Sequence, residues 1–231
     1  MNKPLVLVVE DDTPVRNLIT TTLKTHEYRY LSAQNGASAV MEALSHNPDI
    51  VLLDLGLPDM DGVEIIRKIR SWSNMPIIVI SARTEDSDKI VALDAGADDY
   101  LTKPFRPTIL LMKVKALLRR VERAKVIAKN SENEKILNFG SLVIDPAQRL
   151  VTVNGEQVHL TPTEFDLLVT LARKPKSVLT REKLLEEVWD WVDASGTRTV
   201  DSHVKALRHK LGSETIRTVH GVGYAFEPPE Q

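Results

Sequence analysis

The chain of 231 residues contains no cysteine. This absence excludes disulfide bonds, thiol catalysis and thiolate zinc sites, and it fits a reducing compartment. No apolar run approaches the roughly 20 residues that a membrane-spanning helix requires. The N-terminal stretch MNKPLVLVVED passes from an apolar run directly into acidic residues, unlike a secretion signal. We expect a cytoplasmic protein without a membrane partner.

An excess of charge of one sign is also missing, because the formal net charge is -2. The overall charge therefore indicates neither a nucleic-acid nor a membrane partner. No Gly-x-Gly-x-x-Gly motif follows the first apolar segment, which argues against a dinucleotide-binding enzyme. With 42% hydrophobic and 27% charged residues, the composition is that of a globular protein of one or two domains.

The first half of the chain alternates between apolar segments and segments of helical period. The segments LVLVV, IVLLD, PIIVIS and DDYLT predict buried parallel strands, and YRYLSA predicts one more. Helices are expected over residues 13–25, 37–45, 62–70, 87–95 and 108–120. These repeats predict an α/β fold, a doubly wound (βα)5 domain with a five-stranded parallel sheet, over residues 1–122.

The second half has a different pattern. We expect a linker over residues 123–135 and an α+β winged-helix domain over residues 136–231. Asn154-Gly155 is a strong hairpin signal, and Thr161 with Glu164 forms a capping box that opens a helix. Helices are expected over residues 162–173, 181–189 and 198–211, followed by a hairpin around Gly221 and Gly223.

Several residues that carry chemistry stand at the ends of the expected parallel strands. Glu10 and Asp11 follow the first strand and Asp54 the third, while Ser81 and Lys103 end the fourth and fifth. The carboxyl ends of such strands share one edge of the sheet, where ligands bind. Converging carboxylates stay ionised only with a cation among them, and a site made of oxygen ligands suits Mg²⁺. The set could therefore transfer a phosphoryl group to Asp54.

Each of these residues alone has a simpler explanation. The acidic run Glu10-Asp11-Asp12 can serve as a helix N-terminus, and we expect Asp12 to cap the first helix. Asp54 alone can be a turn residue, and Lys103 alone a solvated lysine. Their placement on one sheet edge favours a functional site.

The motifs VVEDD, DLGLPDMDG, ISAR and GADDYLTKPF resemble the receiver domain of bacterial two-component response regulators. The resemblance implies that Asp54 is the phosphoacceptor and that a sensor histidine kinase is the donor. It implies Mg²⁺ ligands from Glu10, Asp11, Asp54 and the carbonyl of Gly56. It also implies switch and phosphate contacts from Ser81, Tyr100 and Lys103.

A charged face on the fourth and fifth helices suits a symmetric partner, and in the resembling family these helices form a homodimer after phosphorylation. A merely solvated face explains the same composition. Ile109 stands where the family usually has a Glu, so one intersubunit ion pair is absent and apolar contacts become more important. The expected face comprises Lys89, Asp94, Asp98, Asp99, Lys113, Lys115 and Arg120.

The helix expected over residues 198–211 has an apolar seam and a polar face. Val200, Val204, Leu207 and Leu211 should face the core. The basic and hydroxyl-bearing face of this helix could lie in a major groove of double-stranded DNA, with the terminal hairpin beside the minor groove. Alternatively, this face could simply be solvated. The candidate DNA-contacting residues are Arg198, Ser202, His203, Lys205, Arg208, His209, His220 and Gly221.

The motifs LTPTEFDLL, LTREKLLEEVW, RTVDSHVKALRHKLG and GVGY resemble the OmpR/PhoB class of DNA-binding domain, and the whole chain looks most like its KdpE branch, which governs potassium transport. Ala206 and His220 stand where relatives often place an Arg that contacts DNA. By the same resemblance, the loop DWVDASG contacts RNA polymerase.

The residues and the resemblance together predict a phosphorylation-dependent regulator of promoters rather than an enzyme. The receiver would take part only in its own phosphorylation and dephosphorylation. Two alternatives remain open: a phosphohydrolase with Asp54 as covalent intermediate, and a constitutive DNA-binding module.

Overall fold

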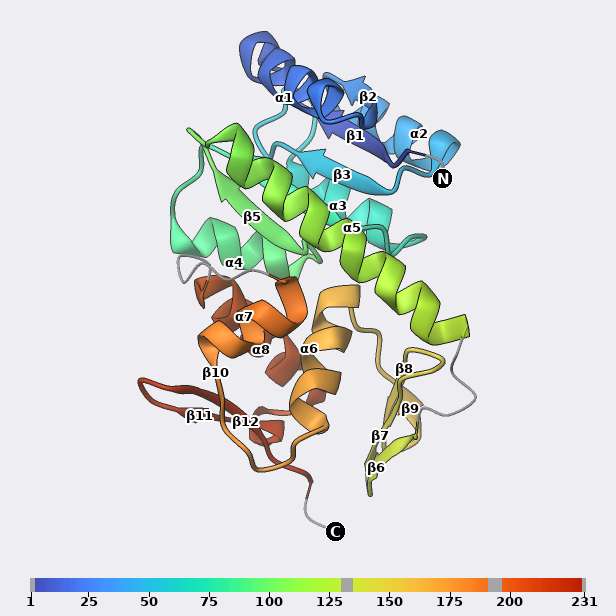
Figure 1. The fold of residues 1–231 in the computed structure, drawn as a ribbon, viewed down its shortest axis with the longest axis vertical. Helices are drawn as coiled ribbons and strands as arrows, with labels where there is room; N and C mark the ends of the chain where they lie inside the picture. The colour runs from blue at the N-terminus through green and yellow to red at the C-terminus, as the bar shows by residue number, and fades with distance from the viewer. Residues whose placement is uncertain (1–2, 130–134, 191–196, 230–231) are drawn as a thin grey trace. The chain divides into compact units, whose positions relative to one another are not determined.

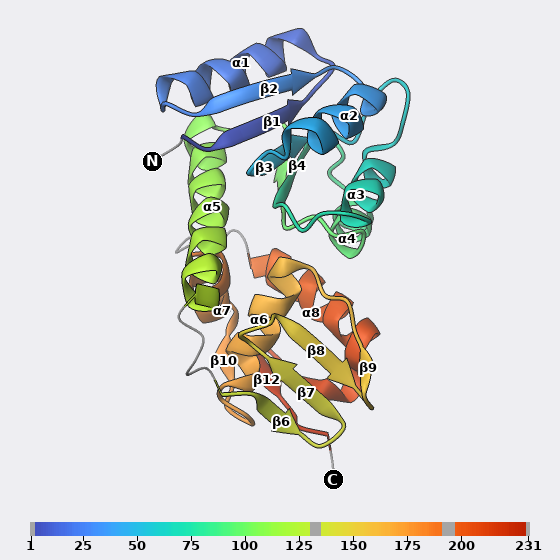
Figure 2. The same ribbon diagram turned by 90° about the vertical axis from the view of Figure 1, so that its right-hand side faces the viewer.

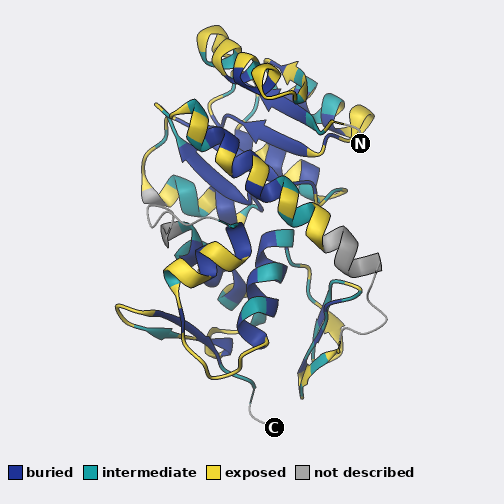
Figure 3. Ribbon diagram, viewed as in Figure 1, coloured by how far each residue is buried: buried dark blue, intermediate teal, exposed yellow. Residues whose placement is uncertain are grey.

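A computed structural model describes residues 3–129, 135–190 and 197–229. The chain forms two compact units, residues 1–118 and 119–231. No described sheet is shared between the units, and each unit has its own buried core (Figures 1 and 3).

The first unit is a five-stranded parallel sheet in the order β2-β1-β3-β4-β5. Apolar strands alternate with amphipathic helices, and each helix brings the chain back to the end of the sheet where the next parallel strand begins. The expected doubly wound fold is confirmed. Its elements are β1 (Leu5–Val9), α1 (Thr13–Thr25), β2 (Arg29–Ala33), α2 (Gly36–His46), β3 (Ile50–Leu53), α3 (Gly62–Arg70), β4 (Ile77–Ser81), α4 (Asp86–Asp94), β5 (Asp99–Thr102) and α5 (Pro107–Lys129).

Helices cover both faces of this sheet: α2, α3 and α4 lie on one face and α1 and α5 on the other (Figure 2). Strand residues such as Leu7 and Val79 pack with Ile65 and Ile69 of α3 in one buried cluster. Because the central strands are covered on both faces, their charged residues can stand only at the strand ends, and these ends carry the site.

Helix ends in this unit follow local signals. The Asp12 side chain accepts a hydrogen bond from the Val15 N–H and caps α1, as predicted. The expected end of α5 was wrong, because the helix continues to Lys129 through part of the expected linker. After Pro107 no Pro or Gly interrupts the sequence before Gly140, and the residues beyond Arg120 are mostly good helix formers.

Among the described residues, the second unit combines two antiparallel sheets with three α-helices and a short 3-10 helix. One sheet has the order β6-β7-β8-β9 and the other β10-β12-β11. The predicted winged-helix architecture is confirmed. Its elements are β6 (Leu137–Phe139), β7 (Leu142–Asp145), β8 (Leu150–Val153), β9 (Glu156–Gln157), α6 (Pro162–Ala172), β10 (Leu179–Thr180), α7 (Arg181–Trp189), α8 (Thr197–Leu211), the 3-10 helix η3 (Ser213–Thr215), β11 (Ile216–Val219) and β12 (Gly223–Phe226).

Local sequence signals also place the ends of these elements. Asn154 and Gly155 have positive φ angles of 54° and 84° in the turn between β8 and β9. The capping box of Thr161 and Glu164 opens α6, and α8 ends before Gly212, whose φ is 101°.

Candidate functional site

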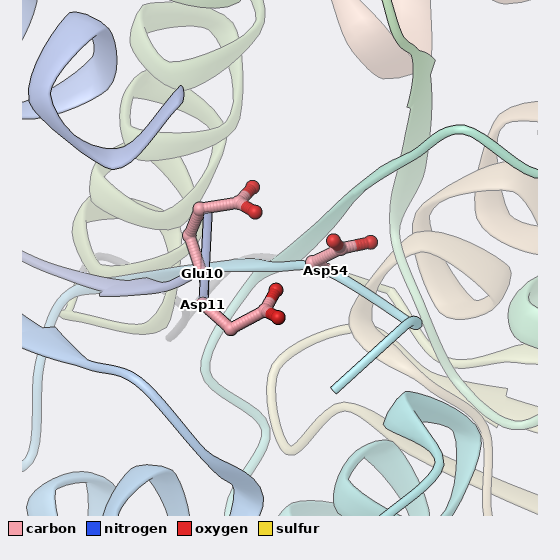
Figure 4. A group of neighbouring side chains, drawn as sticks. All are labelled: Glu10, Asp11 and Asp54. Carbon is pink, nitrogen blue, oxygen red and sulfur yellow. The ribbon is translucent and has the colours of Figure 1, made fainter. Parts of the chain in front are cut away.

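Three carboxylates meet at the carboxyl edge of the parallel sheet (Figure 4). Glu10 and Asp11 follow β1, Asp54 follows β3, and one oxygen of each lies within 4.8 Å of the others. The two strands are neighbours, and the Asp54 N–H donates to the Val9 carbonyl at 2.9 Å. Glu10 and Asp54 are buried, whereas Asp11 is exposed. The expected convergence of these side chains is therefore present.

Lys103 supplies positive charge to this pocket. Its Nζ lies 2.7 Å from Asp54 Oδ2 and 2.7 Å from Glu10 Oε2. Burial raises the pKa of Glu10, and the charge of Asp54 raises it further against the effect of Lys103. Burial by itself would lower the pKa of Lys103, but the hydrogen bonds to both carboxylates outweigh it and this pKa is raised. The ammonium group therefore stays charged and balances one of the carboxylates.

The donor set fits a hard divalent cation such as Mg²⁺. Three carboxylates converge on the pocket, and Lys103 compensates only one negative charge. The exposed Asp11 and Gly56 border the solvent side, where the Gly56 N–H donates to Asp54 Oδ1 at 3.2 Å. Oxygen ligands with access to water are what Mg²⁺ prefers in proteins.

Ser81 and Tyr100 lie on the strands beside the pocket. Ser81 is buried at the end of β4, and its Oγ accepts a hydrogen bond from the Arg83 N–H at 3.3 Å. The Tyr100 hydroxyl donates to the Arg83 carbonyl at 2.8 Å, and burial raises the pKa of Tyr100. Both residues therefore contact the loop between β4 and α4.

Arg83 was not singled out from the sequence, yet it joins two loops at this edge. Its Nη2 lies 2.8 Å from Asp61 Oδ2, and Asp61 caps α3 through the Val63 N–H. Burial opposes ionisation of Asp61, but the hydrogen bonds from Val63 and Arg83 lower its pKa. The Asp61-Gly62 pair before an apolar periodic run is a sequence signal for this cap. The Arg83 contact has no such signal.

Three residues of the expected dimer face are buried, so that part of the prediction was wrong. Asp98 accepts hydrogen bonds from Arg70 and from the Ile77 N–H, each at 2.9 Å. Lys113 Nζ lies 2.6 Å from Asp99 Oδ2, and both side chains are buried. The charge pattern suggested a surface, but each buried charge has a partner on another element.

The other members of the expected face have different surroundings. Asp94 and Lys115 are exposed and Lys89 is half-buried. The unit boundary falls within α5, so Arg120 belongs to the second unit, where its Nε lies 3.4 Å from Asp166 Oδ2. Of the expected face, Lys89 and Asp94 on α4 and Lys115 on α5 therefore remain candidates for a dimer surface.

The apolar seam of α8 is confirmed. Val200, Val204 and Leu207 are fully buried, and Leu211 is half-buried. Ala206 is buried too, so the polar face is narrower than expected.

The polar face of α8 and the turn between β11 and β12 carry most of the expected DNA contacts. Lys205 and His209 are exposed and one turn apart, and Ser202 is half-buried. His220 and Gly221 are exposed between the two strands. Arg198 lies in α8, but its side chain is outside the described residues.

Two expected DNA contacts instead point into the protein. His203 is 0% exposed, and its ring lies 5.4 Å from that of Trp189, so its assignment to the DNA face was wrong. It stands three residues after Val200, within the width of a buried helical stripe. Arg208 is half-buried and donates to the Ile216 carbonyl and to Thr218 Oγ1.

A hydrogen-bonded cluster that the sequence analysis missed connects α7, α8 and β12. Asp201 Oδ1 accepts hydrogen bonds from Arg181 Nε and from the Tyr224 hydroxyl, each at 2.7 Å. The Arg181 guanidinium lies 4.8 Å from the centre of the Tyr224 ring. Burial and the contact with Asp201 raise the pKa of Tyr224 to about 12. The cluster ties the candidate DNA-binding helix to the hairpin.

Comparisons with known proteins cover both units. Residues 6–115 match the response regulator receiver domain, and residues 155–226 match the C-terminal domain of transcriptional regulatory proteins. The chain is 41% identical to the transcriptional regulatory protein ResD of Bacillus subtilis, covering 98% of this chain and 97% of ResD. It is 40% identical to the DNA-binding response regulator MtrA of Mycobacterium tuberculosis, covering 97% of each.

Solved structures are also similar to this chain over nearly its whole length. The OmpR/PhoB homologue DrrB of Thermotoga maritima superposes with a TM-score of 0.51 at 33% identity, covering 98% of this chain and 100% of DrrB. A RitR mutant reaches a TM-score of 0.76 at 29% identity, with 97% and 99% covered. No helix among the described residues is long and apolar enough to span a membrane. The chain belongs to the two-component response regulators of the OmpR/PhoB family, with a receiver domain and a DNA-binding transcriptional regulatory domain.

Proposed function

We propose that Asp54 accepts a phosphoryl group from the phosphohistidine of a sensor kinase and that this modification controls binding to promoter DNA. A new O–P bond forms on the Asp54 carboxylate while the P–N bond of the donor breaks. The observation that carries the proposal is the convergence of three carboxylates and Lys103 at one sheet edge.

Each residue of the pocket has a role in this proposal. Glu10, Asp11, Asp54 and the Gly56 carbonyl would hold Mg²⁺, which neutralises charge on the phosphoryl oxygens when bound. The Asp54 side chain is buried and therefore shielded from solvent. Lys103 Nζ lies 2.7 Å from Asp54 Oδ2, near enough to contact an oxygen of a phosphoryl group bound to Asp54. Ser81 would donate a further hydrogen bond.

The signal would leave the pocket through the loop between β4 and α4. A phosphoryl group on Asp54 would attract the Ser81 hydroxyl, and the Arg83 N–H now donates to that hydroxyl oxygen. Tyr100 holds the carbonyl of the same loop residue. Movement of Ser81 would therefore displace this loop and with it the start of α4.

Phosphorylation would favour a homodimer through α4 and α5. Lys89, Asp94 and Lys115 supply charged surface, and the exposed Val91 and Met112 supply apolar surface. The apolar contribution matters because Ile109 provides no carboxylate for an intersubunit ion pair. A pair of chains would place two DNA-binding domains on neighbouring sites.

In the second unit, α8 would enter the major groove and the β11–β12 turn would lie beside the minor groove. Ser202, Lys205 and His209 are the surface residues on α8 suited to phosphates and base edges, and His220 is suited to the hairpin contact. The predicted RNA polymerase loop falls mainly on residues 191–196, outside the described residues. Access to promoters implies the cytoplasm.

Control of potassium-transport genes stays a prediction from the sequence resemblance. The names of the relatives described above give it no support.

The test is incubation with Mg²⁺ and acetyl phosphate, followed by intact mass measurement and DNA binding. We expect wild type to gain one phosphoryl group and to bind promoter DNA more tightly. Asp54→Asn should gain none, whereas Asp12→Asn, at the exposed N-cap of α1, should react like wild type.

Other outcomes point elsewhere. Continuous turnover of small phosphate esters would indicate a hydrolase. Equal DNA affinity of wild type and Asp54→Asn under phosphodonor would indicate a constitutive binding module and contradict the proposal.

A further inference from the structure

The loop between β3 and α3 contacts the first turn of α2 through Asp59. Asp59 Oδ1 accepts a hydrogen bond from the Gly36 N–H at 2.7 Å, and Oδ2 accepts one from the Ala37 N–H at 3.0 Å. These hydrogen bonds lower the pKa of Asp59, so its carboxylate is ionised at neutral pH. A side chain 22 residues away in sequence from Ala37 thus satisfies two free N–H groups of the helix.

The cap that α2 has in its own sequence is separate. Asn35 stands at the N-cap position, and its side chain accepts from the Ser38 N–H at 2.8 Å. The helix start therefore does not depend on Asp59 alone. The loop, by contrast, has Asp59 as its polar link to α2 among the described contacts.

The fit between the loop and α2 is also tight. A Cβ on Gly36 would lie 2.9 Å from Met60 Cβ and 3.0 Å from Ile65 Cδ1. These distances are shorter than normal carbon contacts, so any side chain at position 36 would push the loop away. Two independent features, a bidentate hydrogen bond and a missing side chain, therefore hold the loop against the helix.

The same loop carries the carbonyl of Gly56 that is proposed as a metal ligand. Its ends are closed by the Gly56–Asp61 bridge and by the hydrogen bond from the Gly62 N–H to the Leu55 carbonyl at 3.1 Å. Asp59 lies inside this closed segment. A displacement of the segment at Asp59 would therefore also shift the backbone at Gly56.

We propose that Asp59 is a positioning residue for the metal site: by fastening the β3–α3 loop to α2, it holds the Gly56 carbonyl in the place needed to bind a divalent cation. This inference rests on the proposed function, since it assumes that the acidic pocket binds Mg²⁺. Asp59 itself does not contact the ion. Substitution of a residue that orients a metal ligand typically lowers the metal affinity without abolishing binding.

The test measures Mg²⁺ affinity of the full chain by isothermal titration. Asp59→Asn, which keeps the shape and weakens the acceptor, should bind Mg²⁺ several-fold more weakly, and Asp59→Ala roughly tenfold more weakly. Gly36→Ala should weaken binding similarly, although it leaves the carboxylate in place. The phosphorylation rate at saturating Mg²⁺ should stay near that of wild type in each case.

Asn35→Ala is the matched control, because it removes a cap from the same helix without touching the loop. It should lower the melting temperature of the receiver domain about as much as Asp59→Ala does, and leave Mg²⁺ affinity unchanged. In wild type, Mg²⁺ should slow hydrogen exchange of the Gly36 and Ala37 amides.

The outcomes separate the two proposals. If wild type binds no Mg²⁺, the proposed function fails. If wild type binds it and Asp59→Ala binds equally well, the positioning role is wrong. It is also wrong if Asn35→Ala loses as much affinity as Asp59→Ala, because helix stability would then explain both.

Discussion

Lys103 contacts two buried carboxylates with one ammonium group. Removing a partner from such a cluster leaves a buried charge without compensation, which costs more than the contact itself contributes. The cost of burying charge is evident at Glu10, because burial raises the pKa of its carboxyl group even with Lys103 present. The pocket therefore trades stability for the ability to bind a cation, and single substitutions should reveal this.

We expect Lys103→Gln to lower the free energy of unfolding of the receiver domain by about 3 kcal/mol in the presence of a chelator. Mg²⁺ should restore part of the loss, because it binds only the folded pocket. Urea denaturation with and without Mg²⁺ measures both effects. Lys24→Gln, on an exposed turn of α1, is the control. An equal, small loss in both variants would refute the charge-balance account.

Tyr224 gives a pH-dependent prediction. Its folded pKa of about 12 lies above the usual value of 10, so the folded state holds the proton more tightly. This contribution to stability is fully present below pH 10 and is lost as the pH rises towards 12. We expect a loss of about 2 kcal/mol in the second domain over that range.

Urea denaturation at several pH values, comparing wild type with Tyr224→Phe, measures this effect. The chain has four tyrosines, so the difference between the ultraviolet titrations of wild type and Tyr224→Phe reports the ionisation of Tyr224. A wild-type stability that falls no more steeply than that of Tyr224→Phe would contradict the prediction.

At the scale of elements, close backbone approach decides which glycines are required. In β12, a Cβ on Gly223 would lie 1.9 Å from the Leu179 carbonyl oxygen of the paired strand β10. Gly155 differs, because its surroundings are open and its φ of 84° is the only obstacle to a side chain. The two positions therefore separate a steric requirement from a conformational one.

We expect Gly223→Ala to separate β10 from β12 and to cost more than about 3 kcal/mol, because backbone must move. Gly155→Ala should cost about 1 kcal/mol, the price of a left-handed conformation. Thermal denaturation of both variants tests the difference. Similar melting temperatures for the two would show that β10 can shift without loss.

At the scale of the whole molecule, the chain has two cores. Leu52 is buried in the sheet of the first unit and Leu167 in α6 of the second. Because the two residues belong to different cores, each should contribute to the unfolding of its own domain.

We expect Leu52→Ala to lower the unfolding temperature of the receiver domain alone and Leu167→Ala that of the DNA-binding domain alone. Each should lose about 3 kcal/mol. Calorimetry should resolve two transitions, and Mg²⁺ should shift only the transition that Leu52→Ala lowers. A single transition shifted by both substitutions would show that the domains unfold together.

Much of the architecture could be read from local patterns. Apolar runs and helical periods predicted the strands and helices of both domains, and caps such as Asp12 and Thr161 marked where helices begin. The strand-end positions of Glu10, Asp54 and Lys103 predicted the pocket, because strand order in this fold places those ends together. These features depend on neighbouring residues or on topology, which the sequence encodes directly.

The tertiary structure alone decided which charged residues turn inward and which loops are joined. Asp98, Asp99 and Lys113 looked like surface residues, but each has a partner of opposite charge on another element. Asp59 reaches α2 across the fold in the same way. A periodic pattern reports the face on which a residue lies, whereas the burial of a charge depends on a partner that only the folded chain brings within hydrogen-bonding distance.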